Sequence, residues 1–160
     1  MHKNLKSGFT LIELLVVVAI IGILASVVLA SLNTARAKGT DAAIKAAMSN
    51  ARAQAELYYD DNVSFDTVCD SGTSGGIYPF VLNAAQKILS SGTPTIADGT
   101  AFSYSSTGSG AYSVCHDSQS AWAAITSLKN PSTSSAGWCV DSTGAAKEAT
   151  TLAISTYECP

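Results

Sequence analysis

The chain has no surplus of positive charge and almost no imidazole. Lysine and arginine number 9 against 12 aspartate and glutamate, so the formal net charge is −3, and only 2 histidines occur among 160 residues. Such a balance lacks the basic footprint of nucleic-acid-binding proteins. The 4 cysteines include no Cys-x-x-Cys pair, so the sequence predicts no zinc site. We expect neither a metal nor another cofactor.

Candidate catalytic groups are also scarce. His116 follows Cys115 directly, but neighbours on a strand point to opposite faces, so the two are not expected to form a dyad. We expect His116 to be a partly exposed surface residue. Four loosely clustered carboxylates lack the spacing of a calcium loop and are interpreted as turn residues: Asp60, Asp61, Asp66 and Asp70. The sequence therefore predicts a protein that is not an enzyme.

What the chain does have is one long apolar run near its N-terminus. Residues 9–32 are almost wholly apolar and their only charge is Glu13, while a short basic and polar stretch precedes them and ends at Gly8. As a helix, the run would be about 36 Å long, enough to cross a bilayer core of about 30 Å. An ionised carboxylate inside such a core is expensive, so Glu13 needs either a partner or a function.

This arrangement resembles the N-terminal region of the type IV pilins and their pseudopilin relatives. The resemblance rests on residues 8–15, Gly-Phe-Thr-Leu-Ile-Glu-Leu-Leu, and on the apolar run with Gly22 that follows, about the first third of the chain. It implies that a prepilin peptidase removes residues 1–8 as a leader by cutting between Gly8 and Phe9. It also implies that the peptidase then methylates the new amine of Phe9.

The same resemblance assigns a role to Glu13. Cleavage would leave an ammonium on Phe9, four residues from Glu13 and at the positive end of the helix dipole. In a filament, the carboxylate of one subunit would neutralise the ammonium of its neighbour, because either charge alone in an apolar core is heavily penalised. Phe9 and Glu13 are therefore expected to set the register of subunits, and residues 10–32 to form the filament core.

Other interpretations of the apolar run are a secretory signal, a plain membrane anchor and a pseudopilin. A secretory signal is disfavoured because the candidate cleavage site precedes the run instead of following it. A plain anchor, carrying a binding domain or an enzyme, would have no use for Glu13. A pseudopilin of a type II secretion system shares every N-terminal feature. The run lacks the proline that many major pilins carry there, which weakens an assignment as a classical major subunit.

The helix is predicted to continue past the membrane as an amphipathic segment, residues 33–61. Ile44, Met48, Ala51, Ala55 and Tyr58 recur at spacings of three and four, which predicts one apolar stripe that packs on a sheet. The two aspartates and the asparagine at residues 60–62 are expected to end the helix.

Residues 62–160 are rich in serine, threonine and glycine, with short apolar alternations typical of strands and turns. We expect a short helix over residues 77–89, with Pro79 near its start and Gly92 ending it. Expected strands are residues 101–105 and 111–115 as one hairpin, 122–128 and 138–141 around a turn at 129–137, and 152–157 as a last strand. The predicted fold class is α+β, a long N-terminal helix packed on a small antiparallel sheet, which is also the fold that the resemblance implies.

The four cysteines, Cys69, Cys115, Cys139 and Cys159, all lie in the part expected to be exported. An even count there suggests two disulfides, with three possible connectivities, although free buried thiols are the alternative. Many pilins close a C-terminal loop with a disulfide. The resemblance therefore favours Cys139 with Cys159, which leaves Cys69 with Cys115.

These observations favour a structural function. We expect a precursor in the cytoplasmic membrane, with the basic residues Lys3 and Lys6 inside and the rest exported. An assembly ATPase and a platform protein would extrude it into a homo-oligomeric helical filament, an extracellular pilus. Adhesion, motility and DNA uptake are all uses of such filaments, and the sequence does not choose among them.

Overall fold

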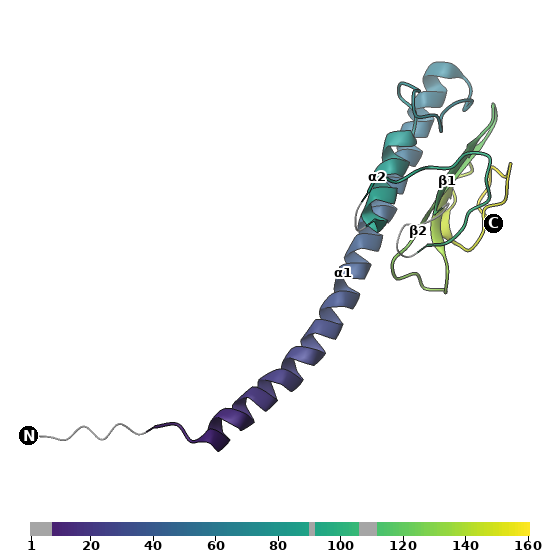
Figure 1. Ribbon diagram of the computed structural model, residues 1–160. Coiled ribbons are helices and arrows are strands. Elements are labelled where there is room, and N and C mark those ends of the chain that lie inside the picture. Colours follow the sequence, from purple (N-terminus) through teal and green to yellow (C-terminus); the bar gives the residue numbers. More distant parts are fainter. Residues whose placement is uncertain (1–7, 90–91, 106–111) are drawn as a thin grey trace, which may run out of the picture. The chain divides into compact units, whose positions relative to one another are not determined.

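The computed structural model describes residues 8–89, 92–105 and 112–160. Its elements are α1 (Leu11–Asn62), α2 (Tyr78–Ile88), β1 (Ser113–Asp117), β2 (Trp122–Ser127), β3 (Gly137–Asp141) and β4 (Ala146–Ala149) (Figure 1). The chain divides into two compact units, Met1–Arg36 and Ala37–Pro160, and α1 contributes residues to both. Of the predicted leader, only Gly8 lies within the described residues.

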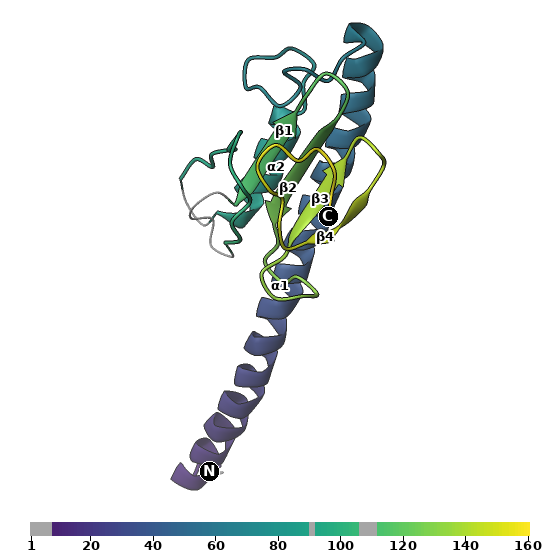
Figure 2. The same cartoon turned by 90° about the vertical axis from the view of Figure 1, so that its right-hand side faces the viewer.

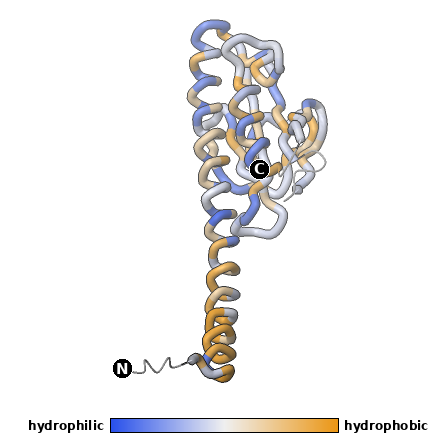
Figure 3. Tube along the Cα trace, turned by 60° about the vertical axis from the view of Figure 1, so that its left-hand side comes forward, coloured by the Kyte–Doolittle hydropathy of each residue, from blue (hydrophilic) through white to orange (hydrophobic). Residues whose placement is uncertain are grey.

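The first unit contains the apolar part of α1. This part is long and apolar enough to cross a membrane, and none of it is buried within the chain. The exposed fraction of its large apolar side chains runs from 43% at Leu32 to 78% at Leu11. Figure 3 shows this apolar stretch as a nearly continuous orange segment. The helix passes through Gly22 without interruption, as expected for a segment that contains no proline.

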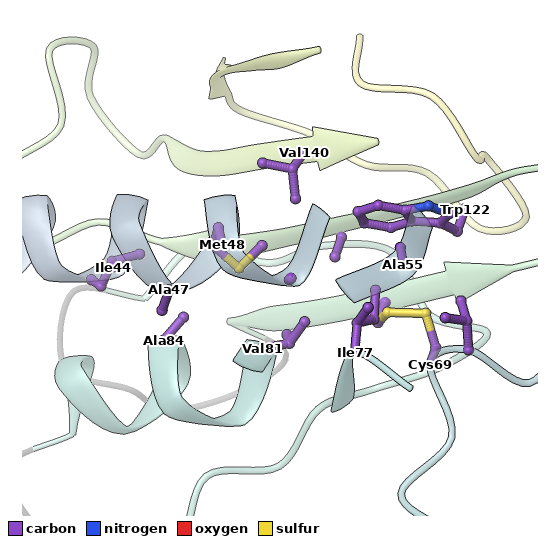
Figure 4. Packing of buried hydrophobic residues seen from close by; sticks show 14 of the residues in the cluster. Ile44, Ala47, Met48, Ala55, Cys69, Ile77, Val81, Ala84, Trp122 and Val140 are labelled. Atoms are coloured by element: carbon purple, nitrogen blue, oxygen red, sulfur yellow. A yellow bond between two sulfur atoms is a disulfide. The ribbon is translucent and has the colours of Figure 1, made fainter. Parts of the chain in front are cut away.

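In the second unit, α1 buries one face. The predicted stripe is buried as a set, together with Ala47 and one charged residue, Asp41. Figure 4 shows part of this core, where Met48 and Ala55 of α1 lie near Val140 and Trp122 of the sheet. Alanines at positions 47, 51 and 55 keep this face of α1 shallow, which lets the other elements approach closely.

The sheet is an antiparallel meander with strand order β1-β2-β3-β4 (Figure 2). Its register pairs Cys115 with Ala124 and Ile125 with Cys139. Alternate residues form two apolar clusters, one shared with α1 and α2 and the other on the opposite face of the sheet. The predicted α+β fold, a long helix on a small antiparallel sheet, is confirmed.

Helix α2 agrees with its predicted position. Pro79 lies in its first turn, where the missing backbone N–H costs nothing. The helix ends at Ile88, before the predicted stop at Gly92, because Leu89 already has an extended backbone. One apolar side of α2 is buried, and three of its residues belong to the same core as the α1 stripe: Val81, Ala84 and Ile88.

Two of the predicted strands are wrong. Residues 101–105 form no strand, and β1 pairs with β2 instead of with them. The predicted hairpin turn between residues 105 and 111 lies outside the described residues. Residues 152–157 also form no strand, and the fourth strand is β4. In both segments, an apolar side chain packs onto the sheet's outer face while the backbone stays outside the ladder. Phe102 and Leu152 are both buried there, and the Phe102 amide donates to the Leu152 carbonyl at 2.9 Å.

Candidate assembly site

The start of α1 is organised by a reciprocal pair, Thr10 and Glu13. The Thr10 amide and hydroxyl both donate to Glu13 Oε2, at 2.9 Å and 2.7 Å. The Glu13 amide in turn approaches Thr10 Oγ1 at 3.3 Å. This is a capping box, in which a threonine before the helix and a glutamate in its first turn satisfy amides that the helix leaves unpaired. The carboxylate of Glu13 is therefore held at the helix N-terminus.

No other described part of the chain covers the side chains around this pair. Phe9, Leu11 and Ile12 have exposed fractions of 83%, 78% and 74%. Exposed apolar surface of this extent marks a membrane or protein contact. The Glu13 carboxylate lies among these side chains and accepts two hydrogen bonds from Thr10, both at Oε2. A carboxylate can accept more hydrogen bonds than two, so Glu13 can also bind a cation from outside the chain.

The predicted processing residues lie just before this pair. Gly8 and Phe9 are exposed and precede the first helical turn. A Cβ added at Gly8 would meet no atom within 4 Å, so no packing within the described chain requires glycine there. Cleavage between Gly8 and Phe9, methylation of Phe9 and pairing of Phe9 with Glu13 all remain predictions.

Both disulfides are present in the second unit. Cys69 bonds to Cys115 across 46 residues, joining the segment after α1 to β1. Cys139 bonds to Cys159 across 20 residues, joining β3 to the C-terminal segment. These are the two pairs that the resemblance to the pilins favours. They lie on opposite faces of the sheet, because Cys115 belongs to the α1 cluster and Cys139 to the outer one.

The prediction that His116 is partly exposed is wrong. Its side chain is 2% exposed. Its Nδ1 lies 3.2 Å from the Thr156 carbonyl oxygen and its Nε2 lies 3.0 Å from that of Thr100. The ring thus bridges the C-terminal segment and the loop before β1, both far from it in sequence. Its neighbour Cys115 points to the other face and is disulfide-bonded, so no cysteine–histidine dyad exists.

Three buried or half-buried aspartates anchor loops. Asp41 accepts from the amides of Lys129 and Asn130 at 2.6 Å and 2.8 Å, which ties α1 to the β2–β3 loop. Asp117 accepts from the Cys69 amide at 2.7 Å. Burial raises the pKa of Asp117, and nearby Asp70, Asp98 and Asp66 raise it further against the effect of that bond. Asp141 binds both the β3–β4 turn and the C-terminal segment.

Within residues 8–89, 92–105 and 112–160, no group of three or more histidine, cysteine or acidic side chains is placed to hold a metal ion. The four carboxylates interpreted as turn residues are all exposed, but Asp60 and Asp61 lie in the last turns of α1, so the interpretation is wrong for these two.

The hydrogen bonds between Glu13 and Thr10 were not predicted from the sequence. A sequence signal for them is present, because threonine followed three residues later by glutamate is the signature of a capping box. It also missed the anchoring roles of Asp41 and Asp141. Their partners are backbone amides as far as 89 residues away, and no local pattern points to them.

Comparison with known proteins agrees with these features. Residues 3–29 match the model of the prokaryotic N-terminal methylation motif. The chain is 39% identical over 88 residues to the type IV wide pilus major component PilA4 of Thermus thermophilus. That alignment covers 55% of this chain and 66% of the relative, slightly less than two thirds of its length. No solved structure matched the chain.

Proposed function

This chain belongs to the type IV pilin superfamily, and from that premise we propose that it is the structural subunit of a type IV pilus. One observation carries the proposal. An apolar helix that no other described part of the chain covers starts at the Thr10–Glu13 capping box and continues into a folded, disulfide-bonded unit. Such a helix needs lipid around it in the precursor and neighbouring helices around it in a filament.

In this proposal, the precursor is held in the cytoplasmic membrane by the first part of α1. Prepilin peptidase cuts after Gly8 and methylates Phe9. An assembly ATPase and a platform protein then move the subunit into a filament outside the cell. The Phe9 ammonium of one copy pairs with Glu13 of the next, replacing the lipid surroundings of both charges with a neutral pair. Thr10 keeps the carboxylate hydrogen-bonded before that partner arrives.

The first test is the intact, non-reduced mass of the protein in material sheared from cell surfaces. We expect a chain that starts at Phe9, carries one added methyl and lacks two hydrogens for each of two disulfides. Processed protein found only in membranes would instead indicate a pseudopilin of a type II secretion system. An intact leader in every fraction would contradict the proposal.

The second test is Glu13→Val. The variant should enter the membrane in normal amounts, because the change only removes a charge from an apolar helix. Filaments counted by electron microscopy should fall by about tenfold or more, since the ammonium of Phe9 would then be buried unpaired. Ser26→Val is the matched control. Its hydroxyl bonds only to the Ile23 carbonyl of its own helix, so filament number should stay normal. Equal filament numbers in both variants would refute the role of Glu13.

A further inference from the structure

The side chain of His116 is buried between two carbonyl oxygens from different parts of the chain. Its Nδ1 lies 3.2 Å from the Thr156 carbonyl oxygen, and its Nε2 lies 3.0 Å from that of Thr100. A carbonyl oxygen only accepts hydrogen bonds, so each ring nitrogen needs a hydrogen to make its contact favourable. A neutral imidazole carries one N–H, whereas the protonated ring carries two. Only the protonated ring therefore satisfies both contacts.

A carboxylate on the same face of the sheet favours a positive charge on this ring. In the register, His116 of β1 pairs with Ala123 of β2, and Ala123 pairs with Asp141 of β3. Residues paired across an antiparallel sheet lie on one face, so His116 and Asp141 flank the small side chain of Ala123, with about 10 Å between their Cα atoms. Burial alone would raise the pKa of Asp141, but its hydrogen bonds lower it below the ordinary value. Its negative charge offsets part of the cost of burying a cation.

Other titratable side chains lie on the elements around His116. Strand β2 contributes none. Those of β1, β4, the loop before β1 and the C-terminal segment, on this face of the sheet or in the chain that covers it, are Asp98, Tyr104, Tyr112, Lys147, Tyr157 and Glu158. Carboxylic acids ordinarily exchange their proton near pH 4, and tyrosine and lysine near pH 10. Histidine is the side chain that ordinarily does so between about pH 5 and pH 8. A change in this region near neutral pH is therefore expected to come from His116.

The ring attaches two segments to the sheet that are not strands themselves. One is the loop before β1, which it contacts at Thr100. The other is the C-terminal segment at residues 150–158, drawn in yellow in Figure 2. The end of that segment is fixed covalently, because Cys159 is bonded to Cys139 of β3. Its middle is attached to β1 through His116, and this attachment depends on a proton.

We propose that His116 is a pH-sensitive latch, whose protonated ring holds residues 98–104 and 150–158 on the outer face of the sheet. The closed form binds the proton more tightly than an open form does, so the latch is closed at acid pH and loosens as the pH rises. A neutral ring donates to one carbonyl and turns a lone pair toward the other. Loosening exposes Phe102 and Leu152, which are both buried in the closed form. The latch does not depend on the proposed filament function, because all its parts belong to one chain.

Hydrogen exchange of the full chain in detergent tests the latch. Peptides from residues 98–104 and 150–158 are compared at about pH 6 and about pH 9, after correction for the intrinsic effect of pH on exchange. Their amides should exchange about fivefold or more faster at the higher pH, because a hydrogen bond from a charged donor stabilises more than one from a neutral donor. Peptides from residues 44–58 of α1 are the internal control and should agree within about twofold. Equal protection of the two segments at both pH values would overturn the proposal.

Two variants assign the effect to the ring. His116→Gln places a neutral amide there, so the difference between the two pH values should disappear. Asp117→Asn is the matched control on the opposite face, where burial raises the pKa of Asp117. Its side-chain carbonyl can still accept from the Cys69 amide, so the difference should persist. A difference that persists in His116→Gln, or that is lost in Asp117→Asn, would contradict the latch. A non-reduced mass with both disulfides checks folding.

Nitrogen-15 NMR reads the ring without changing it. The chain has 2 histidines, so His2→Ala leaves His116 as the only labelled imidazole. In the full chain in detergent, both ring nitrogens should carry a hydrogen at about pH 6, and one should lose it as the pH rises to about 9. Exchange of residues 150–158 should speed up over the same pH range. A neutral ring at pH 6, or a proton lost without any change in exchange, would overturn the proposal even if His116→Gln failed to fold.

Discussion

The buried carboxylate of Asp141 holds two separate segments of the chain in place, the β3–β4 turn and the C-terminal segment. Its Oδ1 accepts from the Thr143 amide and hydroxyl and from the Ala145 amide, at 2.7–3.0 Å. Its Oδ2 accepts from the Cys159 amide at 2.7 Å. Burial alone would raise the pKa of Asp141, but these four donors outweigh it and lower the pKa below its ordinary value. The β3–β4 turn and the chain's end thus depend on one ionised group.

Asp141→Ala should lower the free energy of unfolding by about 3 kcal/mol at pH 7, because it leaves three buried or half-buried amides without their acceptor. A lowered folded pKa means that the stability is fully present above the ordinary value near 3.9 and is lost as the pH falls through the folded value. The gap between wild type and variant should therefore be constant from about pH 5 to pH 8 and should close below about pH 4. Denaturant unfolding of the full chain in detergent, followed by tryptophan fluorescence, measures this difference in stability. Asp61→Ala, at an exposed carboxylate, is the control; an equal loss there would refute the anchoring role.

Single residues were predictable where their partners are close in sequence. The capping box at Thr10 and Glu13 spans three residues and has a known signature. The burial of His116 has no such signal, because its carbonyl partners are 16 and 40 residues away. The same holds for Asp41, whose partners lie on a loop 88 and 89 residues later. Only the folded chain brings these groups together.

Among the elements, α1 was the most predictable and the strands the least. Its stripe repeats over four turns, and tertiary packing buries every residue of it. The segments at 101–105 and 152–157 have short apolar alternations of the kind that strands share with loops packed on a sheet. Strand β4 reads Ala-Lys-Glu-Ala and has no intrinsic strand preference. Strand β4 is held in position by its pairing with β3 and by the ion pair between Lys45 and Glu148.

The small residues of the α1 stripe make a test at this scale. Ala51 is fully buried between α1 and the rest of its unit, whereas Ala53, two residues later, is exposed. Ala51→Leu should lower the free energy of unfolding by about 1–3 kcal/mol, because three added carbons must displace packed neighbours. Ala53→Leu adds the same carbons to the solvent face and should change it by less than about 0.5 kcal/mol. Thermal unfolding of both full-length variants in detergent gives the comparison. A tolerated leucine at residue 51 would mean that this face is not closely packed.

For the whole molecule, the two disulfides supply much of what a small unit cannot gain from its core. Replacing Cys139 and Cys159 together by serine should cost about 3 kcal/mol, and replacing Cys69 and Cys115 about 4 kcal/mol, in the chain-entropy model for loops of 20 and 46 residues. Denaturant unfolding in detergent under non-reducing conditions measures both. Wild-type stability in either double variant would show that the loop is already ordered without its bond.

The molecule's general plan followed from the sequence because it depends on two strong periodic signals in α1, the apolar run and the stripe. The cover on the sheet's outer face did not, because Phe102 and Leu152 meet there from segments 50 residues apart in sequence. Their common position is a property of the tertiary structure.

The disulfides also decide how the molecule responds to mechanical load. If the proposed filament is under tension, a folded unit that unravels would lengthen by about 3.5 Å for each released residue. The bonds at residues 69–115 and 139–159 take 46 and 20 residues out of any such path, about 230 Å of extensible chain. In the proposed filament, each subunit is thus a less extensible link than its length implies, and only the residues outside the two loops can be drawn out under load.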